Sequence, residues 1–246
     1  MINPVAISIG SFEIRWYGII YALFFFIGIL IACRLGKKRN LTKDDIYDFA
    51  LYLIPLSVIG ARLFHVFFYN FSYYMQNPSQ IIAIWNGGVS LYGGIFGAGV
   101  AAFIFCRKKK ILFYDLADVF VIPLAFGTIF GRIGNFINGE LYGKVTNLPW
   151  GVYFEGVSGK RHPTQIYEAI GNLIVFLVLI FIWRKNPKKG VIFWTYMGLY
   201  GAIRFLAEFV RDDKAVFLGM TPTQLVIIPI FAYSVYYLVK ANKTTV

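Results

Sequence analysis

Long apolar stretches alternate with short polar segments along the whole chain. A helix that spans a membrane needs about 20 mostly apolar residues, and seven stretches meet that requirement. They cover residues 17–33, 46–69, 88–106, 116–137, 166–183, 191–210 and 223–239. The pattern predicts an all-α integral membrane protein, a single transmembrane domain over residues 1–246 with seven spanning helices.

The composition excludes a soluble protein. Hydrophobic residues make up 58% of the 246 residues and charged residues only 15%, whereas soluble domains are about 25% charged. A chain this apolar cannot keep its surface in water, so a soluble enzyme, a coiled coil and a disordered chain are all disfavoured.

The positions of the basic residues predict the orientation of the chain in the membrane. Lys and Arg accumulate in cytoplasmic loops. Of the 24 basic residues, 15 lie in alternate segments, namely 34–43, 107–110, 184–189 and 240–243, against six in the other segments and three inside spans. This alternation predicts seven helices with the N-terminus outside and the C-terminus in the cytoplasm. The net charge of +12 therefore indicates topology, and no nucleic-acid partner is expected.

The longest loop, residues 138–165, is then on the outside. It contains the β-prone run P-W-G-V-Y-F at 149–154, so we expect a small extracytoplasmic loop subdomain inserted between the fourth and fifth helices. The tripeptide P-T-Q at 163–165 and 222–224 predicts two helix starts. Thr221 with Gln224 fits a capping box, and His162 is the candidate cap of the fifth helix.

Three arginines lie inside predicted spans, where a charge costs several kcal/mol, about 2.5–3.5 on insertion scales. They are Arg62, Arg132 and Arg204, and no lysine accompanies them. A retinal protein needs a lysine in a late helix to form the Schiff base with retinal, so the missing lysine disfavours this class of protein. Arginine without lysine favours bidentate binding of a carboxylate or a phosphate.

Arg204 shares one helical stripe with Tyr200, Glu208 and Arg211, because their spacings are 4, 4 and 3 residues. One interpretation is a salt bridge from Glu208 that neutralises a buried arginine. The other is an anion site whose arginine is held in place by Glu208. Arg211 lies nearer the outer end of the helix, where an interfacial position would explain it.

Arg132 lies in a glycine-rich run together with Asn135, Asn138 and Glu140. Small residues allow close helix packing, which explains the glycines but not four polar groups at the outer leaflet, so this run favours a functional site. The glycines at 87–99 are a weaker signal, since dimerising helices look similar. Arg62 is a candidate for stabilising the bundle. Together, the two arginine-bearing helices and the outward helix dipoles predict a site for an anionic lipid headgroup.

Six motifs occur in a fixed order along the chain. They are R-W-Y-G at 15–18, G-A-R-L at 60–63, G-G-V-S-L-Y-G-G at 87–94, G-R-I-G-N-F-I-N-G-E-L-Y-G at 131–143, R-H-P-T-Q-I-Y-E at 161–168 and Y-G-A-I-R-F-L-A-E-F-V-R at 200–211. Together they closely resemble the bacterial prolipoprotein diacylglyceryl transferases, and the run at 131–143 is similar to the signature of that family. The resemblance covers nearly the whole chain.

The resemblance implies a reaction and its partners. The family transfers the diacylglyceryl group of phosphatidylglycerol to the lipobox cysteine of a prolipoprotein signal peptide, and glycerol 1-phosphate leaves. The resemblance further implies a multi-pass enzyme of the bacterial cytoplasmic membrane that acts as a monomer, with its site open to the outer leaflet. No metal or organic cofactor is expected.

The resemblance also implies roles for individual residues. Arg132 and Arg204 would hold the phosphate and stabilise its charge as it leaves, with Glu208 paired to Arg204. The other implied site residues are Tyr17, Asn135, Glu140 and Gly143, and the substrate-binding candidates are Arg62, Gly87, Gly93, Gly94, His162 and Tyr200.

One position departs from the family pattern. Many members carry histidine in the third helix where this chain has Tyr92. A tyrosine hydroxyl ionises at about pH 10 and is a poor base at neutral pH, so we expect Tyr92 to orient the headgroup by a hydrogen bond.

Two other classes of protein remain open from the residues alone. A transporter or flippase would line an anion path with arginines, but it predicts inverted repeats and broken helices, and only the P-T-Q echo is present. A receptor or structural membrane protein would leave the buried polar residues without a use.

Overall fold

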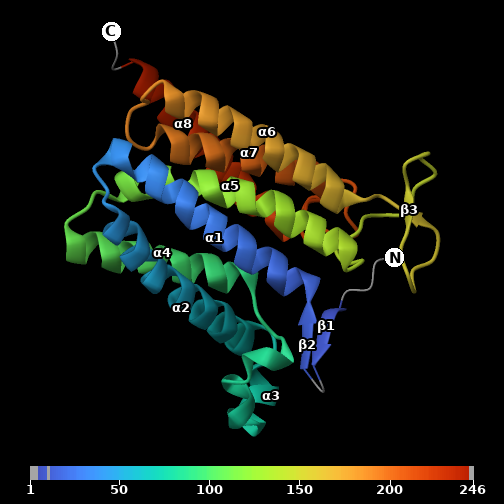
Figure 1. The fold of residues 1–246 in the computed structure, drawn as a ribbon. Coiled ribbons are helices and arrows are strands. Elements are labelled where there is room, and N and C mark those ends of the chain that lie inside the picture. Colours follow the sequence, from blue (N-terminus) through green and yellow to red (C-terminus); the bar gives the residue numbers. More distant parts are fainter. Residues whose placement is uncertain (1–4, 10–11, 244–246) are drawn as a thin grey trace. The chain divides into compact units, whose positions relative to one another are not determined.

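The computed structural model describes residues 5–9 and 12–243, without the side chains of residues 9, 12–15, 17 and 21. The long helices are α1 (Trp16–Gly36), α2 (Lys43–Phe68), α4 (Leu91–Lys109), α5 (Phe113–Ile137), α6 (Thr164–Arg184), α7 (Val191–Glu208) and α8 (Pro222–Lys243) (Figure 1). Each predicted apolar stretch therefore forms a helix, with ends within four residues of those expected.

Short elements connect these helices. They are the strands β1 (Val5–Ile9), β2 (Phe12–Arg15), β3 (Val152–Tyr153) and β4 (Lys160–Arg161), the helix α3 (Phe71–Gln76) and the 3₁₀ turns η1 (Lys37–Arg39), η2 (Pro78–Ile81) and η3 (Ile84–Asn86). The strands pair as two antiparallel hairpins, β1 with β2 and β3 with β4. The hairpin before α1 was not predicted, although the sequence carries a signal for it: Gly10-Ser11 separates the two runs, and glycine at the first of two loop residues is typical of a hairpin turn.

Six of the described helices, α1, α2, α4, α5, α6 and α8, are long and apolar enough to cross a membrane. Helix α7 has 18 residues but is less apolar, since it carries Arg204 and Glu208. The seventh span therefore stays a prediction. The chain forms two compact units, Cys33–Leu116 and the combination of Met1–Ala32 with Ala117–Val246, and we describe each unit by itself.

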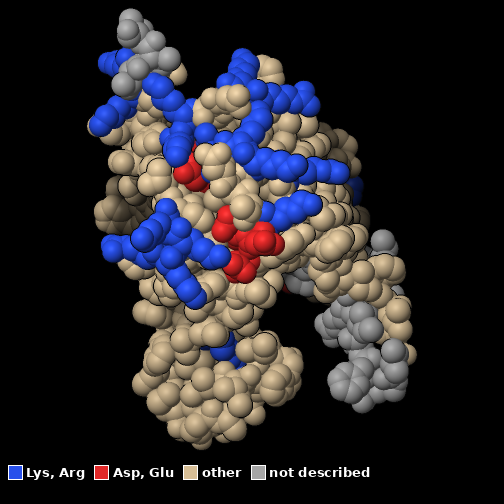
Figure 2. Space-filling view, turned by 60° about the vertical axis from the view of Figure 1, so that its left-hand side comes forward, with Lys and Arg blue, Asp and Glu red and all other residues tan. Residues whose placement is uncertain are grey.

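Basic side chains gather on part of the surface shown in Figure 2, with a small acidic group among them. Four helices of the predicted inward direction carry basic residues in their last turn: α1 has Arg34, α4 has Arg107, Lys108 and Lys109, α6 has Arg184, and α8 has Lys240 and Lys243. Cations at helix C-termini interact favourably with the helix dipole. The basic residues that predict topology therefore also suit the helix ends on which they lie.

In the larger unit, α7 packs against both α6 and α8 (Figure 1). The N-terminus of α7 is capped from a different helix, because Gly190 at its start has no side chain to do so. Asp118 of α5, fully buried, accepts hydrogen bonds from the backbone N–H groups of Gly190 at 2.8 Å and Phe193 at 2.9 Å. A carboxylate at a helix N-terminus satisfies free N–H groups and the dipole together. Asp118 thus fixes the start of the helix that carries Arg204.

The start of α8 is the predicted capping box. Gln224 donates its backbone N–H to the hydroxyl of Thr221 at 3.3 Å, and the side-chain oxygen of Gln224 accepts from the Thr221 N–H at 3.0 Å. The expected cap of α6 is wrong. Pro163 occupies the N-cap position without a side-chain bond, and the His162 Nδ1 lies 3.3 Å from the Tyr167 hydroxyl instead.

In the smaller unit, α2 and α4 pack closely through glycines. A Cβ on Gly93 would overlap the Gly60 carbonyl and the Phe64 Cβ, and one on Gly97 would overlap the Leu56 carbonyl. Small residues let two helix backbones approach in this way. The packing accounts for Gly93, which the sequence places among the substrate-binding candidates.

We expect Gly93→Ala to destabilise this unit, while Gly94→Ala should not. Overpacking costs about 1–3 kcal/mol, whereas a Cβ on Gly94 would meet its nearest atoms at an ordinary 3.8 Å. Alanine also favours a helix by up to about 1 kcal/mol over glycine. Thermal unfolding of both variants in one detergent measures the difference. Equal unfolding temperatures would contradict the packing account.

Candidate active site

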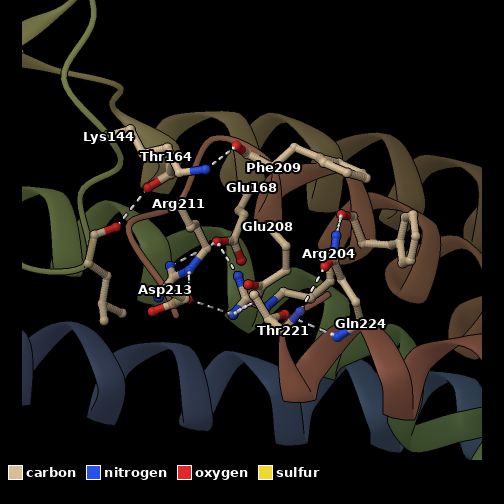
Figure 3. Close-up of polar contacts among 12 residues, drawn as sticks. Lys144, Thr164, Glu168, Arg204, Glu208, Phe209, Arg211, Asp213, Thr221 and Gln224 are labelled. Atoms are coloured by element: carbon tan, nitrogen blue, oxygen red, sulfur yellow. Dashed lines mark hydrogen bonds and ion pairs between the residues drawn. The ribbon is translucent and has the colours of Figure 1, made fainter. Parts of the chain in front are cut away.

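Three arginines and three carboxylates meet at the predicted outer ends of α5, α6 and α7. We call them the arginine–carboxylate cluster, and its members are Arg132, Glu168, Arg204, Glu208, Arg211 and Asp213. Figure 3 shows Glu168, Arg204 and Arg211 with their side chains turned toward one another. The cluster brings together the two arginines that the sequence assigns to a phosphate.

Glu168 is the centre of this cluster. Its carboxylate is almost fully buried, and Arg132 Nη2 lies 2.7 Å from Oε2. Arg204 Nη1 and Arg211 Nη1 lie 3.3 and 3.5 Å from Oε1. One carboxylate on α6 therefore fixes arginines from α5, α7 and the segment after α7.

The sequence analysis missed Glu168, although it ends the R-H-P-T-Q-I-Y-E motif. The available signal was its position one turn inside an apolar helix, where a lone carboxylate is as costly as an arginine. Such a residue demands a cationic partner, and three are present.

The predicted pair of Arg204 and Glu208 is present. Arg204 Nη2 lies 2.6 Å from Glu208 Oε1, one turn apart on α7. The Glu208 oxygens are buried and accept no hydrogen bond of acceptable geometry. The contact with Arg204 is therefore an ion pair without a hydrogen bond. This geometry is compatible with both interpretations of the sequence, a neutralising salt bridge and an anion site. Glu208 neutralises the charge of Arg204 and also holds Arg204 beside Glu168.

Arg211 corrects an expectation. It was expected at the interface, but it is buried, and its Nε donates to Asp213 Oδ2 at 2.7 Å. Burial lowers the pKa of the Arg211 guanidinium, but the hydrogen bond and charge of Asp213, together with Glu168 and Glu208, outweigh burial and hold the pKa above its ordinary value. Arg211 therefore remains a cation within the cluster.

The signature run after Arg132 forms a tight corner that joins α5 to the start of α6. Asn135 donates its side-chain amide to Glu140 Oε1 at 2.8 Å, and Gln165 donates its side-chain amide to the Glu140 carbonyl at 2.5 Å. The Thr164 hydroxyl donates to the Leu141 carbonyl at 2.7 Å. Asn135 and Glu140 thus hold the corner beside the cluster.

Gly143 lies where the chain passes closest to the end of α7. It pairs with Arg211 in a β-bridge, and a Cβ there would overlap the Val210 carbonyl and come within 2.8 Å of Thr164 Cγ2. Only glycine fits this close approach. Lys144 extends the contact, since its backbone N–H donates to the Val210 carbonyl at 2.8 Å. The glycine therefore allows the loop to hold Arg211 in position.

Two further candidates lie on helices of this unit. Tyr200, on α7 one turn before Arg204, stacks on Tyr196 with ring centroids 5.5 Å apart. The backbone of Tyr17 belongs to α1, but its side chain lies outside the described residues.

Comparison with known proteins decides the family. Residues 4–240 match the family model described as prolipoprotein diacylglyceryl transferase. The chain belongs to this family. The relatives named phosphatidylglycerol–prolipoprotein diacylglyceryl transferase include one from Geobacter sulfurreducens, 43% identical over 87% of this chain and 84% of the relative. Others come from Finegoldia magna, 40% identical over 98% and 96%, and Clostridioides difficile, 39% identical over 99% and 98%.

Family membership and the apolar helices together make this a transferase that crosses the membrane several times. Within the described residues, no group of His, Cys, Asp and Glu could hold a metal ion. In this member of the prolipoprotein diacylglyceryl transferase family, the arginine–carboxylate cluster is the polar centre of the larger unit.

The remaining site candidates of this transferase lie in the smaller unit. Arg62 is 4% exposed and donates all five of its N–H groups to backbone carbonyls. The acceptors are Gln80, Ile81, Ala83, Gly87 and Gly88. We therefore reassign Arg62 from substrate contact to organising the segment 80–88, the stabilising role that the sequence also allowed.

Gly87 and Gly88 have positive φ angles of 81° and 75°, a conformation that favours glycine and directs both carbonyls to Arg62. Tyr92 is exposed on α4, with its ring centroid 6.3 Å from that of Phe64. Gly94 has no close neighbour that demands glycine, so packing explains Gly93 but not Gly94.

Proposed function

We propose that this chain transfers the diacylglyceryl group of phosphatidylglycerol to the lipobox cysteine of prolipoproteins, the first step of lipoprotein maturation. The observation that carries the proposal is the largely buried meeting of Arg132, Arg204 and Arg211 in a member of this transferase family. Arginine forks match the oxygens of a phosphate, and phosphatidylglycerol presents a phosphodiester at the depth of the headgroups.

The reaction forms one bond and breaks one. The cysteine sulfur, after losing its proton, attacks the glycerol carbon that bears the phosphate, and a thioether forms. The bond between that carbon and the phosphate oxygen breaks, so its electrons go to the oxygen and glycerol 1-phosphate leaves. The leaving phosphate gains negative charge in the transition state. Arg132 and Arg204, already fixed by Glu168 and Glu208, are positioned to stabilise it without reorganising.

We further propose the orientation that the basic residues predict: seven spans, the N-terminus outside and the C-terminus in the cytoplasm. The cluster then faces the outer leaflet of the bacterial cytoplasmic membrane, where the signal peptide of a prolipoprotein emerges. Residues 138–165 would form the extracytoplasmic subdomain, and the chain would act as a monomer.

The test is a defined reaction. Purified protein, phosphatidylglycerol and a peptide with a lipobox cysteine should yield glycerol 1-phosphate and a peptide heavier by the diacylglyceryl group. A peptide with serine in place of that cysteine is the control. If folded protein yields neither product under conditions in which a named relative does, the proposal is wrong.

Tyr92 is proposed to orient the headgroup and not to act as the base. We expect Tyr92→Phe to lower turnover by no more than about tenfold, the value of one hydrogen bond, and to leave the pH optimum in place. Tyr92→His should also keep that optimum. Rates at several pH values measure both, and lost turnover in the first with a shifted optimum in the second would contradict this role.

A further inference from the structure

The arginine–carboxylate cluster is electrically balanced before any substrate binds. As described, it contains three arginines and three carboxylates, so its formal charge is zero. A phosphodiester would bring one more negative charge into a largely buried site. An unbalanced charge in such a site is strongly unfavourable. Binding is therefore favoured if one of the carboxylates leaves as the phosphate enters.

The three carboxylates differ in how easily they can leave. The side chains of Glu168 and Glu208 are 1% and 0% exposed, and both lie on helices. The side chain of Asp213 is 43% exposed, and residues 212–216 belong to no helix or strand. Moving Asp213 into water breaks no helix and exposes a group that is already partly solvated.

Asp213 also occupies arginine donors that an incoming phosphate oxygen would use. Its Oδ2 accepts from Arg211 Nε at 2.7 Å and lies 4.0 Å from Arg204 Nη2 (Figure 3). A carboxylate and a phosphate use the same arginine donors with similar geometry. The two anions would therefore compete for the same pair of arginines.

We propose that Asp213 is a resident anion of the substrate site, which occupies the arginines in the free enzyme and is displaced by the phosphate of the lipid. This inference rests on the proposed function. Until the lipid arrives, the carboxylate keeps Arg211 oriented beside Arg204 and keeps the formal charge of the whole cluster at zero. Displacement then exchanges one anion for another, so the net charge of the cluster stays at zero in the complex.

The proposal predicts a gain of affinity. If Asp213 blocks the site in most free molecules, only the remaining open molecules can bind the lipid. The apparent affinity for the lipid is then the intrinsic affinity multiplied by the open fraction. We therefore expect Asp213→Asn to lower KM for phosphatidylglycerol about threefold or more. Asp213→Glu keeps the charge and should restore KM toward the wild-type value.

Asp212→Asn is the matched control. Asp212 is adjacent, its side chain is 61% exposed, and it pairs with Arg161 at 3.3 Å, outside the cluster. Steady-state rates with phosphatidylglycerol varied at saturating peptide give KM and kcat for all variants, and thermal unfolding shows that each is folded. A KM for Asp213→Asn that equals or exceeds that of Asp212→Asn would overturn the inference. A purely structural role of Asp213 predicts that its replacement weakens the binding of the lipid.

The two proposals fail in different ways. If the wild type forms no thioether, the proposed function fails. If the wild type forms product and Asp213→Asn shows no fall in KM, only the displaced-anion inference fails. Equilibrium binding of short-chain phosphatidylglycerol without peptide gives a second readout, in which Asp213→Asn should bind more tightly and short-chain phosphatidylcholine should show no such gain.

Discussion

Replacing Arg132 or Arg204 with alanine should reduce diacylglyceryl transfer by about 100-fold or more, the largest effect that we expect from any single side chain. Each substitution removes donors that the proposed function assigns to the phosphate, and losing one preorganised donor typically costs about 100- to 1,000-fold in kcat. Arg132→Lys and Arg204→Lys should recover only part of the activity, because lysine keeps the charge but loses the planar fork.

Lys144→Ala is the matched control for both arginines. It removes a positive charge from the same region, but the Lys144 side chain is exposed and donates to the Phe209 carbonyl at 3.0 Å, outside the cluster. Rates with the lipobox peptide, together with thermal unfolding, distinguish chemistry from folding. Folded arginine variants with near-wild-type rates would exclude both residues from the reaction, and failure of both variants to fold would make their role structural.

Glu168→Gln should produce the second largest loss, about 100-fold in kcat/KM. Glutamine keeps the shape of the side chain but not the charge that holds three arginines, and a displacement of about 1 Å in a catalytic group can cost 100-fold. Breaking a buried ion pair also costs about 3–5 kcal/mol of stability. Glu155→Gln, an exposed carboxylate on the segment before α6, is the control.

A double variant separates positioning from general stability. If Glu168 acts by placing Arg132, then Glu168→Gln adds little to the loss already caused by Arg132→Ala, because residues in one network are not additive. Fully additive losses would contradict the positioning role. Glu168 differs in this respect from Asp213, because Glu168 is buried, lies on a helix and contacts three arginines, so it cannot leave without dismantling the site.

The sequence predicts the helices well because their driving force is local. Each apolar stretch forms a helix with ends close to those expected, and the Thr221–Gln224 box is present at the start of α8. These features depend on residues that are neighbours in the chain. The capping box of Thr42 and Asp45 at the start of α2 follows the same local rule and was missed only because it precedes the apolar run.

The site was predicted only in part, because its partners come from distant segments. Arg132, Arg204 and Glu208 could be selected as charges at membrane depth. Glu168 could not be assigned three arginines, since they lie on other segments. Arg62 was selected by the same signal, a charge at membrane depth, but its partners are not a ligand. Backbone carbonyls of a loop 18 to 26 residues away accept its hydrogen bonds and offset the cost of burying the charge.

The most direct test of the central claim is an experimental structure with phosphatidylglycerol bound. We predict the lipid phosphate within hydrogen-bonding distance of the guanidinium groups of Arg132 and Arg204, with Glu168 still holding Arg132. A phosphate bound elsewhere, with Arg132 and Arg204 still paired only to Glu168 and Glu208, would contradict the account.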